Sequence, residues 1–186
     1  MQDEKIVELY WLRDENAILE TKQKYGTYLS KIAYNILNDF EDSRECVNDT
    51  YLKAWNSMPP QKPNVLKTYL GKITRQLSID IFRTRNRKKR VSSQYTISLS
   101  ELEQCIPNTQ TTEQEIEIQL LGKLINDFLY TLPEQTRNIF VCRYYFCDSI
   151  KNISAFFAIS ESKVKSSLYR TRLSLKDYLE REEFFV

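Results

Sequence analysis

Residues 149–179, SIKNISAFFAISESKVKSSLYRTRLSLKDYL, predict more about the fold than any other stretch of the chain. Ile150, Ile153 and Phe156 repeat at helical spacing in the first part, and Ser160 is a suitable N-cap for a second helix. The buried stripe predicted for that second helix consists of Val164, Leu168, Thr171, Leu175 and Leu179. The pattern indicates a short helix, a tight turn and a longer helix, which is the layout of a helix-turn-helix.

The rest of the second helix is basic and carries hydroxyl groups. Its side chains at steps of three or four residues are Lys165, Tyr169, Arg172 and Lys176, with Ser166 and Arg170 beside them. A helix of this kind fits the DNA major groove, where such groups contact phosphates and base edges. The alternative is a surface helical hairpin whose charged face is only solvated.

Composition favours an all-α protein of one large or two small domains. The 186 residues include only 3 Gly and 5 Pro, and alternation of β-branched residues is scarce. Residues 91–118 hold five acidic and no basic side chains, and they separate two blocks that are basic to neutral. We therefore predict two helical domains, 1–90 and 113–186, joined by a flexible acidic linker, 91–112, with at most a helical turn near Leu99–Cys105.

The residues available for chemistry exclude several function classes. Histidine is absent, and the four cysteines show no CxxC spacing. A zinc site, a c-type haem and a Cys/His nucleophile are therefore not expected, and no catalytic residue, metal or cofactor is predicted. Cys46 and Cys142 fit apolar helical patterns, and a redox role for Cys105 or Cys147 stays open.

No apolar run in the sequence is long enough to span a bilayer, and the acidic start MQDEKIVELY is unlike a signal peptide. We expect a cytoplasmic protein with no membrane insertion.

Four helices are predicted in the first block, at about 3–12, 15–37, 41–55 and 65–85. The inward face of the third carries Cys46, Thr50 and Ala54. The other face carries Glu45, Asn48, Asp49, Leu52 and Lys53. That face is either simply solvated or a protein-docking surface. The apolar Leu52 among charged residues favours the docking surface.

The fourth helix ends in a strongly basic run. Residues 83–90, RTRNRKKR, carry six positive charges, and like charges repel unless an anion neutralises them. Contact with nucleic-acid phosphate is the prediction, and a disordered basic tail is the alternative. The predicted core stripe of this helix consists of Leu66, Tyr69, Leu70, Ile73, Leu77 and Ile81. The side chains that lie off this stripe are Lys72, Arg75, Gln76 and Arg83.

The second block begins with a predicted helix at about 113–130. Residues 131–134, TLPE, are typical of a capping box with proline in the first turn of the next helix. The helix-turn-helix then completes a four-helix domain.

Taken together, the two blocks resemble bacterial RNA polymerase sigma factors of the sigma-70 family, extracytoplasmic-function (ECF) group. EDSRECVNDTYLKAW (41–55) is similar to the family's core-polymerase-binding helix, and TYLGKITRQLSIDIFRTRNRKKR (68–90) to its −10 promoter helix. LLGKLINDFLYTLPEQTRNIF (120–140) is similar to the start of the C-terminal domain, and ISESKVKSSLYRTRLSLKDYL (159–179) to the −35 recognition helix. Each motif alone has modest specificity, but the order and spacing of the four motifs make the resemblance specific.

The resemblance implies a transcription initiation factor with no enzymatic activity of its own. Its implied partners are core RNA polymerase, duplex −35 DNA, melted −10 DNA and an anti-sigma factor. It implies core binding by Glu45, Asn48, Asp49, Leu52 and Lys53, −10 contact by Lys72, Arg75, Gln76 and Arg83, and −35 contact by Lys165, Ser166, Tyr169, Arg170 and Arg172. The Pro-rich loop 59–67 matches the loop that receives a flipped base.

This chain departs from the family pattern at two positions of note. Gln76 stands where many relatives have asparagine, which lengthens the amide's reach, and Ala158 lies where glycine is frequent. The competing hypothesis is a polymerase-independent helix-turn-helix regulator that binds a palindromic site as a dimer.

Overall fold

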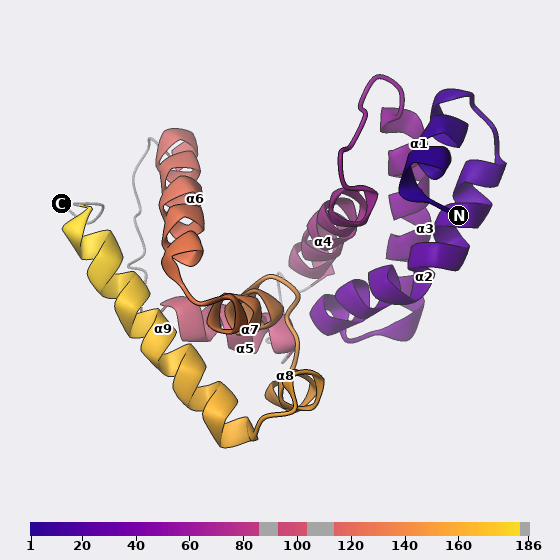
Figure 1. The fold of residues 1–186 in the computed structure, drawn as a ribbon. Helices are drawn as coiled ribbons and strands as arrows, with labels where there is room; N and C mark the ends of the chain where they lie inside the picture. Colours follow the sequence, from indigo (N-terminus) through magenta and orange to yellow (C-terminus); the bar gives the residue numbers. More distant parts are fainter. Residues whose placement is uncertain (86–92, 104–113, 183–186) are drawn as a thin grey trace. The chain divides into compact units, whose positions relative to one another are not determined.

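The computed structural model describes residues 1–85, 93–103 and 114–182, with side chains from residue 119 onward in the last range. Within these ranges all regular secondary structure is α-helical (Figure 1). The chain divides into two compact units, Met1–Tyr95 and Thr96–Val186. These observations confirm the predicted all-α class and its two helical domains. No helix in the described ranges has the length and hydropathy needed to cross a lipid bilayer.

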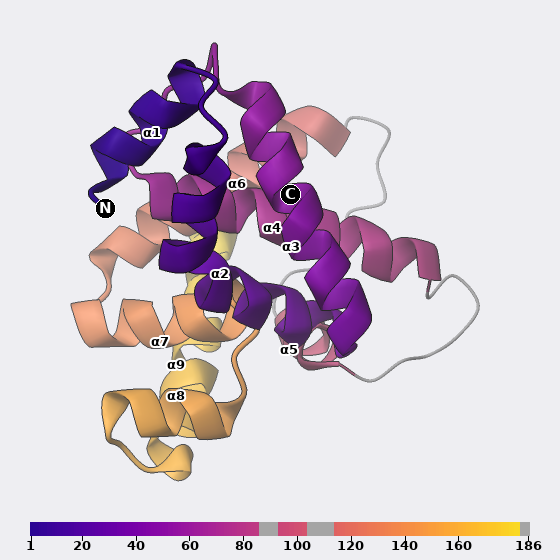
Figure 2. The same cartoon turned by 90° about the vertical axis from the view of Figure 1, so that its right-hand side faces the viewer.

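The first unit is built from four helices whose bounds differ from the predicted ranges by at most two residues. They are α1 (Asp3–Trp11), α2 (Asn16–Leu37), α3 (Phe40–Ser57) and α4 (Leu66–Arg85). Helices α2, α3 and α4 pack against one another and α1 packs on α2, as Figure 2 shows. The motifs predicted to bind core polymerase and the −10 element thus lie on two helices of one packed bundle.

The turn between α2 and α3 has a local chemical cause. Asn38 adopts a left-handed conformation with φ of 52°, which asparagine tolerates better than most residues, and α2 ends there. Asp39 then caps α3, because its side chain accepts a hydrogen bond of 2.9 Å from the Asp42 backbone N–H. This cap begins the helix that carries the predicted polymerase-binding face.

The buried face of α4 differs from the predicted one. Leu77 and Ile81, expected in the core, are only half-buried, whereas Thr74 and Ser78 are fully buried. The reason is close helix packing, which short side chains permit. At Gly71 an added Cβ would lie 2.6 Å from the Oη atom of Tyr28 on α2, so any larger residue there would require the Tyr28 side chain to shift.

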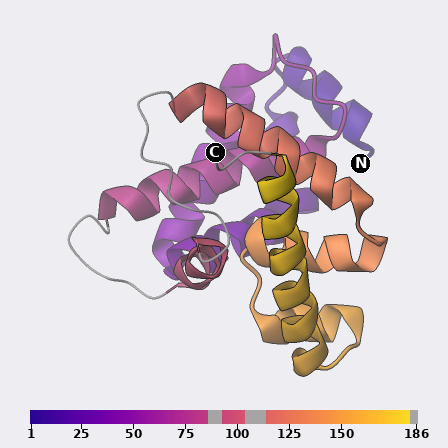
Figure 3. The same cartoon turned by 90° about the vertical axis from the view of Figure 1, so that its left-hand side faces the viewer.

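The second unit contains α6 (Gln114–Thr131), α7 (Glu134–Tyr144), α8 (Ile150–Phe157) and α9 (Glu161–Arg181). Figure 3 faces α9, which α6, α7 and α8 all contact. The core combines apolar side chains of all four helices, including Leu124, Phe128, Ile139, Phe140, Ile153, Val164, Leu168, Leu175 and Leu179.

The helix-turn-helix prediction is confirmed by the caps of α8 and α9. The Ser149 hydroxyl accepts from the Asn152 N–H at 3.1 Å, and the Ser160 hydroxyl accepts from the Lys163 N–H at 3.2 Å. The predicted capping box at 131–134 is wrong. Thr131 instead closes α6 by donating to the Phe128 carbonyl at 2.7 Å, and Pro133 stands at the N-cap of α7 without a side-chain hydrogen bond.

One further helix, α5 (Gln94–Glu103), lies where a flexible linker was expected. Its Ser98 is buried, and Leu102 packs against the core of the second unit. Residues 96–103 therefore belong to the second unit. The rest of the expected linker, together with most of the basic run at 83–90, lies outside the described residues.

Candidate functional site

The outer face of α3 presents every side chain predicted to bind polymerase. The inner face of α3 is buried through Cys46, Thr50 and Ala54. The outer face exposes Glu45, Asn48, Asp49, Leu52 and Lys53. Leu52 is 58% exposed on this face. An apolar side chain displayed in this way is a natural contact for another protein.

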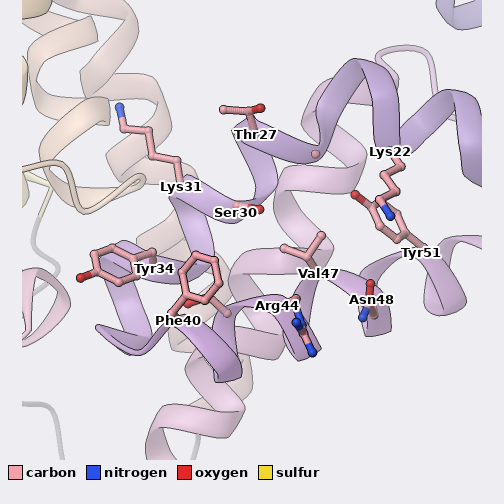
Figure 4. Close-up of a pocket in the computed structure, with 12 residues that line it drawn as sticks. Lys22, Thr27, Ser30, Lys31, Tyr34, Phe40, Arg44, Val47, Asn48 and Tyr51 are labelled. Atoms are coloured by element: carbon pink, nitrogen blue, oxygen red, sulfur yellow. The ribbon is translucent and has the colours of Figure 1, made fainter.

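A groove between α2 and α3 borders this face (Figure 4). Its volume is about 770 Å³, and Asn48 lines it together with aromatic and cationic side chains. Phe40 is 72% exposed at its rim. Lys22, Lys31 and Arg44 give the groove a positive character, so it differs in charge from the acidic Glu45 and Asp49 nearby.

A buried polar seam fastens α3 to α4. The Thr50 and Thr74 hydroxyls are 3.0 Å apart, and the Cys46 Sγ lies 3.2 Å from the Ser78 Oγ. Burial raises the pKa of the Cys46 thiol to about 11, so the thiolate is disfavoured. The seam holds the outer faces of the two helices in a fixed relation. Sequence periodicity placed Cys46 and Thr50 inward but missed Thr74 and Ser78 of α4, because it counts apolar residues.

The predicted −10 side chains share one face of α4. Lys72, Gln76 and Arg83 are exposed and Arg75 is half-buried on that face. Arg85, the last residue of α4, forms an ion pair with the buried Asp42 of α3. The start of the basic run is therefore attached to the first unit. Arg85 is paired with a carboxylate, which distinguishes it from the nearby Arg83.

The Pro-rich loop between α3 and α4 is held at its start and in its middle. The Tyr69 hydroxyl of α4 lies 2.7 Å from the Ser57 Oγ and 2.8 Å from the Gln61 Oε1. Met58 is fully buried at the start of the loop. These contacts support a loop of defined shape beside the −10 face.

Four of the five predicted −35 side chains lie in the open on α9. Lys165, Ser166, Tyr169 and Arg170 are exposed, and Tyr169 is 57% accessible. The opposite face is buried in the helix-turn-helix core through Val164, Leu168 and Leu175. A phenol, a hydroxyl and two cations on one accessible helix face can contact bases and phosphates together.

Arg172 is the exception among these side chains. Its side chain is only 14% exposed, its Nη1 donates to the Tyr144 Oη at 2.6 Å, and it lies 3.6 Å from the Glu101 Oε2. Steps of three and four residues drift around a helix, and by Arg172 the row has reached the edge of the buried face. The structure thus places Arg172 at the inner edge of this face: its guanidinium lies 6.0 Å from the centroid of the Tyr169 ring, while its hydrogen bond is made to Tyr144.

Sequence reasoning also missed the partners of Arg172. Arg143 of α7 is 1% exposed, and Glu101 of α5 accepts from its Nε at 3.1 Å and from its Nη2 at 2.7 Å. Burial opposes ionisation of Glu101, but hydrogen bonds and charges from Arg143, Tyr144 and Arg172 outweigh it and lower the pKa of that carboxyl. The sequence offered one indication of this buried pair, which was Arg143 next to the apolar residues of α7.

Two remaining predictions concern metals and cysteines. Within the described ranges no three Cys, Asp or Glu side chains are grouped so that they could hold a metal ion. Cys147 is fully buried and has φ of 53°, and Cys105 lies outside the described residues.

Comparison with known proteins agrees with this division into two units. Residues 22–88 match the family described as Sigma-70 region 2, and residues 123–175 match the one described as Sigma-70, region 4. An ECF RNA polymerase sigma factor, SigE of Mycolicibacterium smegmatis, is 24% identical over 165 residues, which cover 86% of this chain and 60% of that protein. The chain therefore spans less than two thirds of that relative's length. The α3 and α4 faces lie in the region 2 match and the α9 face in the region 4 match, and with both regions present in one chain, the protein belongs to the sigma-70 family.

Proposed function

We propose that this protein is a sigma factor of the ECF group, which binds core RNA polymerase, directs it to −35/−10 promoters and assists promoter melting. The observation that carries the proposal is the set of three exposed polar faces on α3, α4 and α9, each backed by a buried face of the same helix. Both sigma-70 regions in one chain support it, since a simple DNA-binding regulator would need only the second.

Each face has a distinct proposed role. Glu45, Asn48, Asp49, Leu52 and Lys53 dock on polymerase; Lys72, Arg75, Gln76 and Arg83 contact the melted −10 strand; Lys165, Ser166, Tyr169 and Arg170 read the −35 duplex. A melted strand calls for cations along its backbone and a pocket for an unstacked base, which the Pro-rich loop beside α4 would supply. Duplex reading calls for a recognition helix such as α9.

Control by an anti-sigma partner is part of the proposal. A protein that covered the exposed Leu52 and the neighbouring groove rimmed by Phe40 would prevent polymerase from docking. The proposed action on DNA and polymerase also implies a cytoplasmic location.

The direct test is run-off transcription with purified core polymerase on a pool of genomic fragments. Transcripts that share upstream −35 and −10 elements, and that appear only when this protein is added, are the expected result. A protein that neither co-elutes with core polymerase nor yields such transcripts, but binds a palindrome as a dimer, would support the polymerase-independent regulator instead.

The α3 assignment has its own matched experiment. Alanine at Glu45, Asp49 and Lys53 together should abolish co-elution with core polymerase while leaving helicity unchanged, because all three side chains are exposed. A control with alanine at Glu4, Lys5 and Glu8 makes the same change of charge on the exposed side of α1. Equal polymerase binding by the two triple variants would contradict the assignment.

A further inference from the structure

A single carboxylate in α5 connects three helices of the second unit. Glu101 accepts from the Arg143 Nε and Nη2 atoms of α7, which makes a two-point pair, and it accepts from the Tyr144 hydroxyl at 3.0 Å. Arg172 of α9 lies 3.6 Å from the same carboxylate and donates to the Tyr144 Oη at 2.6 Å. We call Glu101, Arg143, Tyr144 and Arg172 the arginine cluster.

The cluster is enclosed by the domain. Arg143 is 1% exposed and Tyr144 is 7% exposed. The third guanidinium nitrogen of Arg143 donates to the Asp148 carbonyl at 2.9 Å, just before α8 begins. A buried guanidinium needs hydrogen-bond acceptors and a counter-charge, and Glu101 supplies the charge along two of its donor directions.

Arg172 connects the arginine cluster to the part of α9 that is proposed to read DNA. Arg172 lies three residues after Tyr169 and two after Arg170, both exposed on the proposed reading face. On the same helix Leu168 and Leu175 are buried in the core. Arg172 is the polar attachment between the reading segment of α9 and the helix α5, so a change at Glu101 acts on the orientation of that segment.

The position of Glu101 is informative because it lies outside both sigma-70 matches, which cover 22–88 and 123–175. Apolar and polar contacts nevertheless join α5 to the second unit: Leu102 packs against its core, and the Ser98 hydroxyl lies 3.9 Å from the Cys147 Sγ. The recognition domain is thus completed by a helix that precedes its family-defined part.

We propose that Glu101 is a positioning residue for the recognition helix α9, acting through Arg143, Tyr144 and Arg172. The inference rests on the proposed function, since it assumes that α9 reads a −35 duplex. Glu101 itself touches no DNA in this proposal. It sets how sharply α9 distinguishes the correct −35 sequence from others.

The test uses the full chain with core polymerase and the promoter recovered by run-off transcription. Three templates are compared: the intact promoter, one with a scrambled −35 element, and one with a pre-melted −10 segment and no −35 element. Glu101→Gln keeps the shape and removes the charge. Glu103→Gln makes the same exchange at an exposed site of the same helix and is the matched control.

The expected result is a loss of −35 discrimination with Glu101→Gln of about tenfold or more, measured as the ratio of transcripts from intact and scrambled promoters. Glu103→Gln should stay within about twofold of the unchanged protein, and on the pre-melted template all variants should agree within about twofold. Glu101→Asp should recover part of the loss, because it restores the charge on a shorter side chain.

A purely structural role is distinguished by Tyr144→Phe. This variant keeps the two-point pair of Glu101 with Arg143 and removes the hydroxyl that bridges Glu101 and Arg172, which leaves only their direct ion pair of 3.6 Å. It should lower discrimination with unchanged helicity and should speed hydrogen exchange of amides around Arg172 in α9. Discrimination by Glu101→Gln equal to that of the unchanged protein would overturn the inference. A loss in Glu101→Gln that Tyr144→Phe shares in neither discrimination nor exchange rate would overturn it too.

Failure of the proposed function has a different signature. If the unchanged protein transcribes both promoters equally, α9 does not read a −35 element, and the proposed function falls together with the inference. If the unchanged protein discriminates and Glu101→Gln does so equally well, only the inference falls.

Discussion

Replacing Ala158 by glycine should stabilise the helix-turn-helix. Ala158 follows α8 in a left-handed conformation with φ of 52°. The Ala158 N–H donates to the Ala155 carbonyl at 3.4 Å, and the Ile159 N–H donates to the Ser154 carbonyl at 3.1 Å. This is the Schellman arrangement, in which the left-handed position is usually glycine. The sequence already marked Ala158 as a departure from the family pattern, and the structure shows its conformational consequence.

The expected gain follows from two opposing terms. A left-handed conformation costs a residue with a Cβ about 1–2 kcal/mol, whereas glycine costs about 0.5–1 kcal/mol more backbone entropy on folding. The Ala158 methyl group is exposed, so little buried contact is lost. The net change is a stabilisation of roughly 0.5–1 kcal/mol, or about a two- to fivefold smaller unfolded fraction of the second unit.

The assay must report on the second unit alone. Both tryptophans, Trp11 and Trp55, lie in the first unit, so their fluorescence serves as an internal control that should not change. Native-state hydrogen exchange of the buried α9 residues Leu168 and Leu175 measures the opening of the second unit. Slower exchange at these amides is the expected result.

Ala155→Gly is the matched variant, since Ala155 is exposed inside the right-handed helix α8. The same chemical change there should destabilise by about 0.5–1 kcal/mol, because glycine gains nothing and loses entropy. Opposite signs at positions three residues apart are therefore predicted. If both substitutions destabilise the second unit, the reasoning from backbone conformation is refuted.

Three further predictions follow from single contacts. Gly71→Ala should destabilise the first unit by roughly 1 kcal/mol, read by tryptophan fluorescence in urea, because its Cβ would meet the Tyr28 Oη at 2.6 Å. Such overpacking costs about 1–3 kcal/mol, and the better helix propensity of alanine offsets about 0.5–1 kcal/mol of it. Tyr28→Phe in the same chain should recover most of the loss, and no recovery would contradict the clash. Burial raises the pKa of the Cys46 thiol to about 11, so iodoacetamide at pH 8 should modify Cys46 far more slowly in the native than in the unfolded protein. Mass spectrometry measures the two rates, and equal rates would contradict the burial of Cys46. The folded-state pKa of Glu101 lies below its ordinary 4.5, so its stabilising contribution is full above pH 4.5 and is lost as pH falls through the folded value. Glu101→Gln should flatten this pH dependence, measured by hydrogen exchange of the α7 amides. An unchanged slope would argue against the contribution of Glu101.

Apolar periodicity predicted the helices well where the buried face is apolar. In α9 the stripe of Val164, Leu168 and Leu175 was sufficient, and Ser160 capped the helix as its side chain predicts. In α4 the same method chose Leu77 over Thr74, because it counts apolar residues and ignores size. Small hydroxyl side chains are buried there because they let helices approach closely while bonding to each other and to the preceding turn.

The position of a site residue on its helix was predictable, but its long-range partner was not. Lys165 and Arg170 are exposed as the pattern of α9 indicates, whereas Arg172 is drawn to Tyr144, a residue 28 positions earlier in the chain. The buried Arg143 is paired with Glu101, 42 positions earlier. Helical periodicity contains no information on contacts between distant segments, so such pairs become visible only in the folded structure.

Charge averaged over a segment also concealed where the second unit begins. The five acidic side chains of residues 91–118 favoured a solvated linker, because unpaired acids prefer water. One of them, Glu101, instead lies in the helix α5 and pairs with two arginines of the second unit. Any hinge between the two units must therefore leave residues 96–103 with the second unit, and a fragment that begins after Glu103 would leave the buried Arg143 without the carboxylate that pairs with it. Such a fragment is expected to read DNA poorly even though it contains the whole helix-turn-helix.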